Sequence, residues 1–374
     1  LLVVCAFMIA PIIVAFVYGE TAVLPAFFIP MAVVLVVCGA FLLASRRRNG
    51  ELSAKSGFFL VTLAWLSAAG VGAIPFVLSG AIPSYTDAFF ETMSGFTTTG
   101  ASILTDLETL PRGILFWRAL TQWLGGMGVL VLCVAILPFL GVGGMQIYRA
   151  EMPGPSKDRL TPRIGRTAGL LWGVYVLLTL AETLCLHFGG MSWFDAVCHT
   201  FTTLSTGGFS TRTDSVAAFD SLYIELVIIV FMFLSSINFA LHYRALTGAP
   251  QRYAGDPELR FFCGILAGSI LLVSLNIWKT SSPSLGQAVR EAAFQCTSII
   301  STTGFCTADF DRWPDTSRMV LMTLMFLGGC AGSTGGGIKM VRIFVLFKAM
   351  LREIRTYMLP NAVLRVKLGR KPLE

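Results

Sequence analysis

Long apolar runs, separated by short polar segments, recur along the whole chain of 374 residues. One of them, the uncharged run from Gly57 to Gly80, is long enough to cross a bilayer as a helix. The spanning helices that this pattern predicts lie near residues 1–18, 24–44, 57–80, 114–138, 166–188, 221–241, 261–278 and 317–347. The pattern therefore predicts an all-α polytopic membrane protein.

Composition agrees with this prediction. Apolar residues make up 55% of the chain, charged residues 13%, and the mean hydropathy is +0.74, whereas soluble domains carry about a quarter charged residues. The nine cysteines and three histidines are scattered, which disfavours a disulfide framework or a zinc site. An intramembrane enzyme would need paired acids or a Ser/His pair at membrane depth, and only the lone Glu182 comes near that requirement. We therefore expect no enzyme.

Charge indicates the orientation. Arg46, Arg47 and Arg48 follow the second predicted span, and the positive-inside rule places them in the cytoplasm together with most other basic residues. The acids collect on the opposite side, and they include Glu91, Asp106, Glu108, Asp214, Asp309 and Asp311. Two interpretations stay open: an acidic vestibule that concentrates cations, or outer loops that lack bases only for topological reasons.

Three semi-polar segments between predicted spans align without gaps. They read "DAFFETMSGFTTTGAS" from Asp87, "DAVCHTFTTLSTGGFS" from Asp195 and "EAAFQCTSIISTTGFC" from Glu291. Each opens with an acid and Ala, continues as a short semi-apolar helix, and reaches a Thr-rich turn that ends in Gly100, Gly208 or Gly304. The segments are too short to span a bilayer, so we expect re-entrant loops.

Such a unit suits a cation filter. The acid at the amino end is expected to cap free N–H groups and to match the helix dipole. Thr and Gly in the following turn can present backbone carbonyls in place of an ion's hydration shell, and Gly permits left-handed backbone. Ordinary turns between helices are the alternative, but three copies in register favour the filter.

The turns "TTTGAS", "STGGFS" and "STTGFC", with residues 120–155 and 326–348, resemble the potassium transporter superfamily that includes TrkH, KtrB and plant HKT proteins. The TrkH branch is the most similar, and the resemblance covers essentially the whole chain. It implies potassium uptake across a bacterial cytoplasmic membrane through one shared filter of backbone carbonyls. The ion-facing residues that it implies are Thr98, Thr99, Thr206, Gly207, Thr302 and Thr303, with Gly100, Gly208 and Gly304 setting the geometry.

The resemblance also implies a domain organisation. Residues 1–56 would form two N-terminal helices, and residues 57–148, 149–250 and 251–374 would form three pore units. The family builds its pore from four units, so the fourth unit is missing and we expect the chain to be a fragment. A sodium-permeable or sodium/proton-coupled transporter is the alternative; Gly100, where sodium-associated plant relatives have Ser, favours potassium.

The stretch "GGCAGSTGGGIK" at residues 328–339 interrupts the last predicted span. A phosphate-binding loop needs Lys directly after Gly and a preceding strand, but Ile338 stands between Gly337 and Lys339. Three successive glycines, each costing about 1 kcal/mol in a helix, predict a non-helical break over 328–337. The stretch resembles the family's intramembrane gating loop, with Gly332, Gly335, Gly336 and Lys339 as gate residues.

Lys339 has two interpretations. Its charge could face passing cations, or it could extend toward the cytoplasmic interface beside Arg342.

Partners follow from the resemblance too. It implies membrane lipid, a homodimer, and a peripheral TrkA-like nucleotide-binding regulatory subunit, with no nucleic acid and no cofactor besides the substrate potassium. The basic segment 149–159 and the tail beyond Lys348 are the candidate contacts. These charges could equally serve topology alone.

Overall fold

The computed structural model describes residues 1–44, 54–128, 164–280, 282–358, 367–368 and 371–372. Helices make up nearly all regular structure there, apart from one antiparallel pair of two-residue strands, β1 (Lys367–Leu368) and β2 (Lys371–Pro372). The all-α prediction is confirmed. Contacts divide the described chain into two compact units, with unit 1 ending at Ile228 and unit 2 beginning at Ile229.

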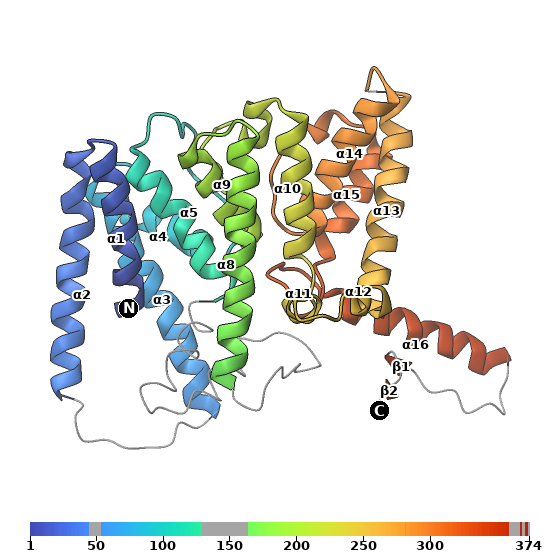
Figure 1. Cartoon of the computed structure of the whole chain (residues 1–374), viewed down its shortest axis with the longest axis horizontal. Coiled ribbons are helices and arrows are strands. Elements are labelled where there is room, and N and C mark those ends of the chain that lie inside the picture. The colour runs from blue at the N-terminus through green and yellow to red at the C-terminus, as the bar shows by residue number, and fades with distance from the viewer. Residues whose placement is uncertain (45–53, 129–163, 281, 359–366, 369–370, 373–374) are drawn as a thin grey trace. The chain divides into compact units, whose positions relative to one another are not determined.

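Unit 1 holds the first two re-entrant segments. Its elements are α1 (Leu2–Val17), η1 (Thr21–Val23), α2 (Leu24–Ala44), α3 (Ala54–Leu78), α4 (Tyr85–Phe96), α5 (Arg112–Gly126), α8 (Ile164–Phe188), α9 (Trp193–Leu204), η3 (Ser215–Phe219) and the start of α10 (Leu222–Ser235). The short helix α4 packs against α3 and α5, and the short helix α9 packs against α5 and α8 (Figure 1). Helix α5 therefore lies beside both re-entrant helices.

Unit 2 holds the third segment. It comprises the end of α10, then α11 (Phe239–Leu246), α12 (Gln251–Gly255), α13 (Pro257–Trp278), α14 (Leu285–Ile300), η4 (Phe310–Arg312), α15 (Asp315–Phe326) and α16 (Met340–Met358). The re-entrant helix α14 packs against α13 and α15 (Figure 1). Phe262, Val273, Cys296 and Ile300 are fully buried in the apolar core between them.

Four helical stretches in the described residues are long and apolar enough to cross a membrane: Thr21–Phe41, Phe59–Leu78, Ala168–Phe188 and Pro257–Trp278. They match four of the predicted spans. Helix α1 is apolar but only 16 residues long. The predicted span at 114–138 is described only to residue 128, with α5 ending at Gly126, and its remainder lies outside the described residues.

The spanning helix predicted near 221–241 is not continuous in the structure. Helix α10 ends at Ser235, and α11 begins at Phe239 after a bend of 101°. The side chain of Asn238 accepts a hydrogen bond from the Ala240 N–H at 2.9 Å. Asn favours such a cap over a helix interior because its side chain competes for backbone hydrogen bonds.

The predicted break in the last span is confirmed. Helix α15 ends at Phe326 and α16 begins at Met340, and we call the intervening residues 327–339 the break loop. Leu327 and Ile338 pair as an isolated parallel bridge. A Cβ added at Gly328 would lie 1.9 Å from the Gly336 carbonyl oxygen, so this close approach requires glycine.

Candidate functional site

All three re-entrant helices end in turns with the same backbone conformation. We call residues 97–100, 205–208 and 301–304 turns 1, 2 and 3. Thr98, Thr206 and Thr302 have φ of 53°, 56° and 63°, and two residues later Gly100, Gly208 and Gly304 have φ of 78°, 76° and 83°. A β-branched residue rarely adopts this left-handed region. Backbone strain of this kind concentrates at functional sites, which makes the three turns the candidate site.

The residue between each strained pair is held identically. Its N–H donates back into the preceding helix with an N–O distance of 2.9 Å in each case: Thr99 to Ser94, Gly207 to Thr202 and Thr303 to Ser298. In turns 1 and 3 a hydroxyl pair adds to this, at 2.8 Å between Thr97 and Thr99 and between Ser301 and Thr303. Turn 2 has Gly207 at that position and lacks the hydroxyl.

The expectation that the acids cap the re-entrant helices is wrong. The caps are serines, whose hydroxyls accept from the N–H three residues later: Ser84 from Asp87, Ser192 from Asp195 and Ser284 from Gln287. Asp87 and Asp195 do lie in the first turn, where they match the dipole. Glu291 does not, because α14 begins at Leu285. The spacing S-x-x-D or S-x-x-Q was the available sequence signal.

Turns 1 and 2 touch within unit 1. A Cβ added at Gly100 would lie 2.2 Å from the Gly207 carbonyl oxygen. No side chain can occupy that position without displacing backbone, so Gly100 is required both for its left-handed φ and for this contact.

Gln122 of α5, a residue that the sequence did not single out, supports turn 2. Its Nε2 donates to the Gly207 oxygen at 2.8 Å, and its Oε1 accepts from the Phe209 N–H at 3.0 Å. The side chain is fully buried, so both hydrogen bonds form away from water. A polar residue within the apolar run 114–138 was the signal that marks such a site.

A buried ion pair lies behind both turns. The Arg118 Nε is 2.7 Å from the Glu91 Oε1, and both side chains are almost completely buried. Glu91 also accepts from Ser102 and Ile103, which follow turn 1. Arg118 donates to the Ser210 oxygen after turn 2 at 3.0 Å. Glu91 is therefore structural, because Arg118 pairs with it inside the protein, and it does not contribute to the vestibule that one of the two open interpretations describes.

The other five acids named on the outer side are exposed: Asp106, Glu108 and Asp214 in unit 1, and Asp309 and Asp311 in unit 2. Glu108 accepts hydrogen bonds from the Thr213 hydroxyl and from the Thr213 N–H, the latter at 2.9 Å. These hydrogen bonds lower the pKa of Glu108, so the carboxylate stays charged well below neutral pH. It links the segment after turn 1 to the segment after turn 2.

Turn 3 has a different neighbour. In unit 2 the Thr302 hydroxyl accepts from the Gly336 N–H at 2.7 Å. A Cβ added at Gly335 would lie 3.2 Å from the Ser301 oxygen. The break loop therefore lies directly against turn 3.

Unit 2 contains two helix breaks, one between α10 and α11 and one in the break loop, and their backbone groups form hydrogen bonds with each other. The Phe239 N–H donates to the Gly332 oxygen at 3.0 Å, and the Cys330 N–H donates to the Ser236 oxygen at 2.8 Å. The Ser235 oxygen accepts from Thr334. Irregular backbone at membrane depth is tolerated only with such partners.

Glu258, in the first turn of α13, secures the break loop from another side. Its Oε1 accepts from the Ala331 N–H at 2.7 Å and from the Val341 N–H at 3.0 Å. Sequence reasoning singled out neither Glu258 nor Asn238. The polar cluster "SSIN" inside an apolar run was a signal for Asn238, whereas nothing local indicated the role of Glu258.

Lys339 closes the break loop on itself. Its side chain is 7% exposed, and its Nζ donates to the carbonyl oxygens of Gly335 and Ser333. The interpretation in which the Lys339 side chain extends to the cytoplasmic interface is therefore wrong. Gly332, Gly335, Gly336 and Lys339 belong to one hydrogen-bonded loop, while a role opposite passing cations stays a prediction.

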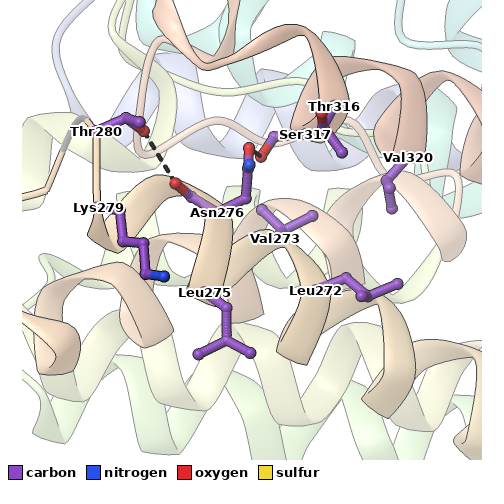
Figure 2. Close-up of a pocket in the computed structure, with 9 residues that line it drawn as sticks. All are labelled: Leu272, Val273, Leu275, Asn276, Lys279, Thr280, Thr316, Ser317 and Val320. Atoms are coloured by element: carbon purple, nitrogen blue, oxygen red, sulfur yellow. Dashed lines mark hydrogen bonds between the residues drawn. The ribbon is translucent and has the colours of Figure 1, made fainter.

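A separate hollow of about 410 Å³ lies between α13 and α15. Figure 2 shows its apolar wall of Leu272, Leu275 and Val320 with Lys279 at one side. The Ser317 hydroxyl donates to the Asn276 Oδ1 at 2.7 Å there. An ammonium group and an apolar wall do not suit a cation, so this hollow is no second ion site.

Re-entrant helices that end in strained Thr–Gly turns, together with broken spans, define the class as a polytopic membrane transport protein. The TrkH family model, described as cation transport protein, matches residues 23–374. The chain is 46% identical to the Trk system potassium uptake protein TrkH of Salmonella typhimurium, over 98% of this chain and 76% of that protein. It is 37% identical to TrkG of Escherichia coli K12, over 97% of this chain and 76% of that protein.

The crystal structure of the potassium transporter TrkH from Vibrio parahaemolyticus superposes with a TM-score of 0.86 at 40% identity. The match covers 100% of this chain and 77% of that one. The chain belongs to the TrkH family of cation transport proteins. The predictions of family, fold class and a transporter in place of an enzyme are confirmed.

Proposed function

We propose that this protein takes up potassium across the bacterial cytoplasmic membrane. The observation that carries the proposal is the left-handed Thr followed by a left-handed Gly in turns 1, 2 and 3. The names of the relatives, which are potassium uptake proteins, support the choice of ion. The chain spans 76% of those relatives, so the division into three pore units, with a fourth outside this chain, belongs to the proposal.

The proposed filter uses backbone carbonyls. Thr98, Thr99, Thr206, Gly207, Thr302 and Thr303 contribute the oxygens that replace the hydration shell of potassium. Gly100, Gly208 and Gly304 allow the backbone to present them. Thr99, Gly207 and Thr303 lie near one conduction axis in this proposal, with the carbonyls pointing inward.

The break loop is the proposed gate. Its contact with turn 3 through Gly336 and Thr302 supports a position directly beneath the filter. The protein works as a homodimer with a peripheral nucleotide-binding subunit. One candidate contact, residues 149–159, lies outside the described residues, as do Arg46–Arg48; the other begins within α16.

Uptake of radioactive rubidium by bacterial cells that lack their own potassium systems tests the proposal with the full-length gene. Saturable rubidium uptake is expected, and potassium should compete with it far better than sodium. Uptake no higher than in cells with an empty vector would contradict the transport function. Equal competition by sodium would favour the sodium-permeable alternative.

A further inference from the structure

One polar position recurs in all three re-entrant helices. It is the fifth residue of each aligned segment, and it is Glu91 in α4, His199 in α9 and Gln295 in α14. These side chains are at most 1% exposed, although they differ in charge and shape. A polar side chain that is buried at the same point of three repeats needs a hydrogen-bond partner there, and the partner indicates its role.

The partner lies in each case among the four residues that follow the turn. We call residues 101–104, 209–212 and 305–308 the post-turn segments. The hydrogen bonds join Glu91 to Ser102 at 2.9 Å, His199 to Ser210 at 2.9 Å and Gln295 to Ala308 at 3.2 Å. Ser102 and Ser210 occupy equivalent positions of the repeat. Each re-entrant helix therefore binds the segment that leaves its own turn.

His199 engages both of its ring nitrogens. The Nδ1 lies 2.8 Å from the Asp195 carbonyl oxygen, which can only accept, so Nδ1 carries the hydrogen. The Nε2 of the neutral ring then accepts from the Ser210 hydroxyl. The Ser210 Oγ in turn accepts from the Arg212 N–H at 3.0 Å. The imidazole thus connects α9 to the backbone that follows turn 2.

Ser210 is held from a second helix as well. Arg118 of α5 pairs with Glu91 at 2.7 Å and donates to the Ser210 carbonyl oxygen at 3.0 Å. The hydroxyl of Ser210 therefore binds His199, while its carbonyl oxygen binds the Glu91–Arg118 pair. Because these contacts are separate, replacing His199 loosens one side of the post-turn segment and leaves the ion pair in place.

We propose that His199 is a positioning residue for the ion selection described under the proposed function, on which this role rests. His199 touches no ion; it acts through Ser210, which lies three residues after Gly207 of turn 2. Filter carbonyls select an ion only when the surrounding hydrogen bonds hold their geometry. Loss of the contact between His199 and Ser210 frees the post-turn segment and lets the carbonyls of turn 2 move.

Competition of rubidium uptake by sodium tests this role in the full-length protein. His199→Leu removes both hydrogen bonds and should lower the preference for potassium over sodium several-fold. His199→Gln introduces the residue that α14 has at this position and should restore most of the preference. His187→Leu is the matched control, because His187 also binds a carbonyl oxygen, that of Met191, but lies on α8. An unchanged preference in His199→Leu, or an equal loss in His199→Gln, would overturn the proposal.

Hydrogen–deuterium exchange of the purified full-length protein tests the positioning without transport. His199→Leu and Ser210→Ala should each speed amide exchange in residues 209–212 several-fold, with residues 305–308 unchanged. The double variant should exchange no faster than Ser210→Ala alone, because both changes remove the same hydrogen bond. Unchanged exchange in both single variants would overturn the proposal. If the unmodified protein takes up no rubidium, the proposed function fails, while this measurement still decides the role of His199.

Discussion

Turn 2 in unit 1 and turn 3 in unit 2 share their backbone conformation but not their supports. The Gly207 oxygen of turn 2 is bound by the buried amide of Gln122, on a helix that the Arg118–Glu91 pair secures. Turn 3 instead offers the Thr302 hydroxyl to Gly336 of the break loop, which is exposed. The same turn conformation is thus supported by a buried polar network in unit 1 and by a non-helical segment in unit 2.

The two units also differ in the helix that packs next to their turns, which is α5 in unit 1 and α15 in unit 2. In unit 1 a Cβ on Gly125 would lie 2.1 Å from the Phe96 oxygen, and one on Gly126 would lie 2.6 Å from the Ser205 Cα. Helix α5 therefore makes close backbone contact with the last residue of α4, just before turn 1, and with the first residue of turn 2. In unit 2, α15 ends at Phe326 and the break loop takes that place. The comparison teaches that close backbone contacts support the turns of unit 1, whereas a non-helical loop supports turn 3 in unit 2.

The largest effect is expected from Glu91→Ala. It leaves the buried Arg118 guanidinium without its partner, which costs about 3–5 kcal/mol of folding free energy. Thermal unfolding in detergent, followed by size-exclusion chromatography, should show a large loss of folded protein. The control, Asp315→Ala, removes the exposed partner of Arg318 and should cost about 1 kcal/mol or less. Equal stability of the two variants would contradict the buried network.

Gly100→Ser comes next. The new Cβ collides with the Gly207 oxygen at 2.2 Å, and a non-glycine residue at φ of 78° adds about 1–3 kcal/mol of strain. Competition of rubidium uptake by sodium should rise markedly. Gly80→Ser is the matched control, because Gly80 has φ of 76° and nothing within 4 Å of an added Cβ. Selectivity unchanged in Gly100→Ser would refute the contact between turns 1 and 2.

A smaller effect is expected from Gln122→Leu. The Gly207 oxygen and the Phe209 N–H both lose their buried partner, at a cost of about 1–3 kcal/mol. Rubidium flux should persist, with reduced preference for potassium over sodium. Gln287→Leu, at an exposed amide that binds Glu291 in unit 2, should behave like the unmodified protein. An unaltered ion preference in Gln122→Leu would contradict the claim that the hydrogen bonds of Gln122 to turn 2 affect ion preference.

The smallest effect is expected from Thr302→Val, which sharpens the comparison on the unit 2 side. Losing the hydrogen bond to Gly336 costs about 0.5–1.5 kcal/mol, so single-channel open probability should rise several-fold with selectivity retained. Thr323→Val removes a hydroxyl that bonds only the Met319 oxygen on α15 and serves as the control. A selectivity change without a gating change would contradict a gating role for the contact between Thr302 and Gly336.

Local signals predicted the turns and the break. Repetition in register identified Gly100, Gly208 and Gly304, and the glycine run predicted the break loop, because backbone strain and helix propensity are properties of short segments. The bend after Ser235 depends on Thr334, 99 residues away, and the burial of Glu91 depends on Arg118 of another helix. Mean hydropathy cannot reveal such pairings, since each requires the tertiary fold.

Deletion of Cys330–Gly336 in the full-length protein tests the central claim most directly. Rubidium flux and the potassium-to-sodium preference would be measured together, on protein shown to be folded by size-exclusion chromatography. The account predicts higher flux, weaker control by the cytoplasmic subunit and an unchanged ion preference. Flux that stays unchanged or falls in the folded deletion protein would contradict a gate at the break loop, and a lost ion preference would contradict the separation of filter and gate.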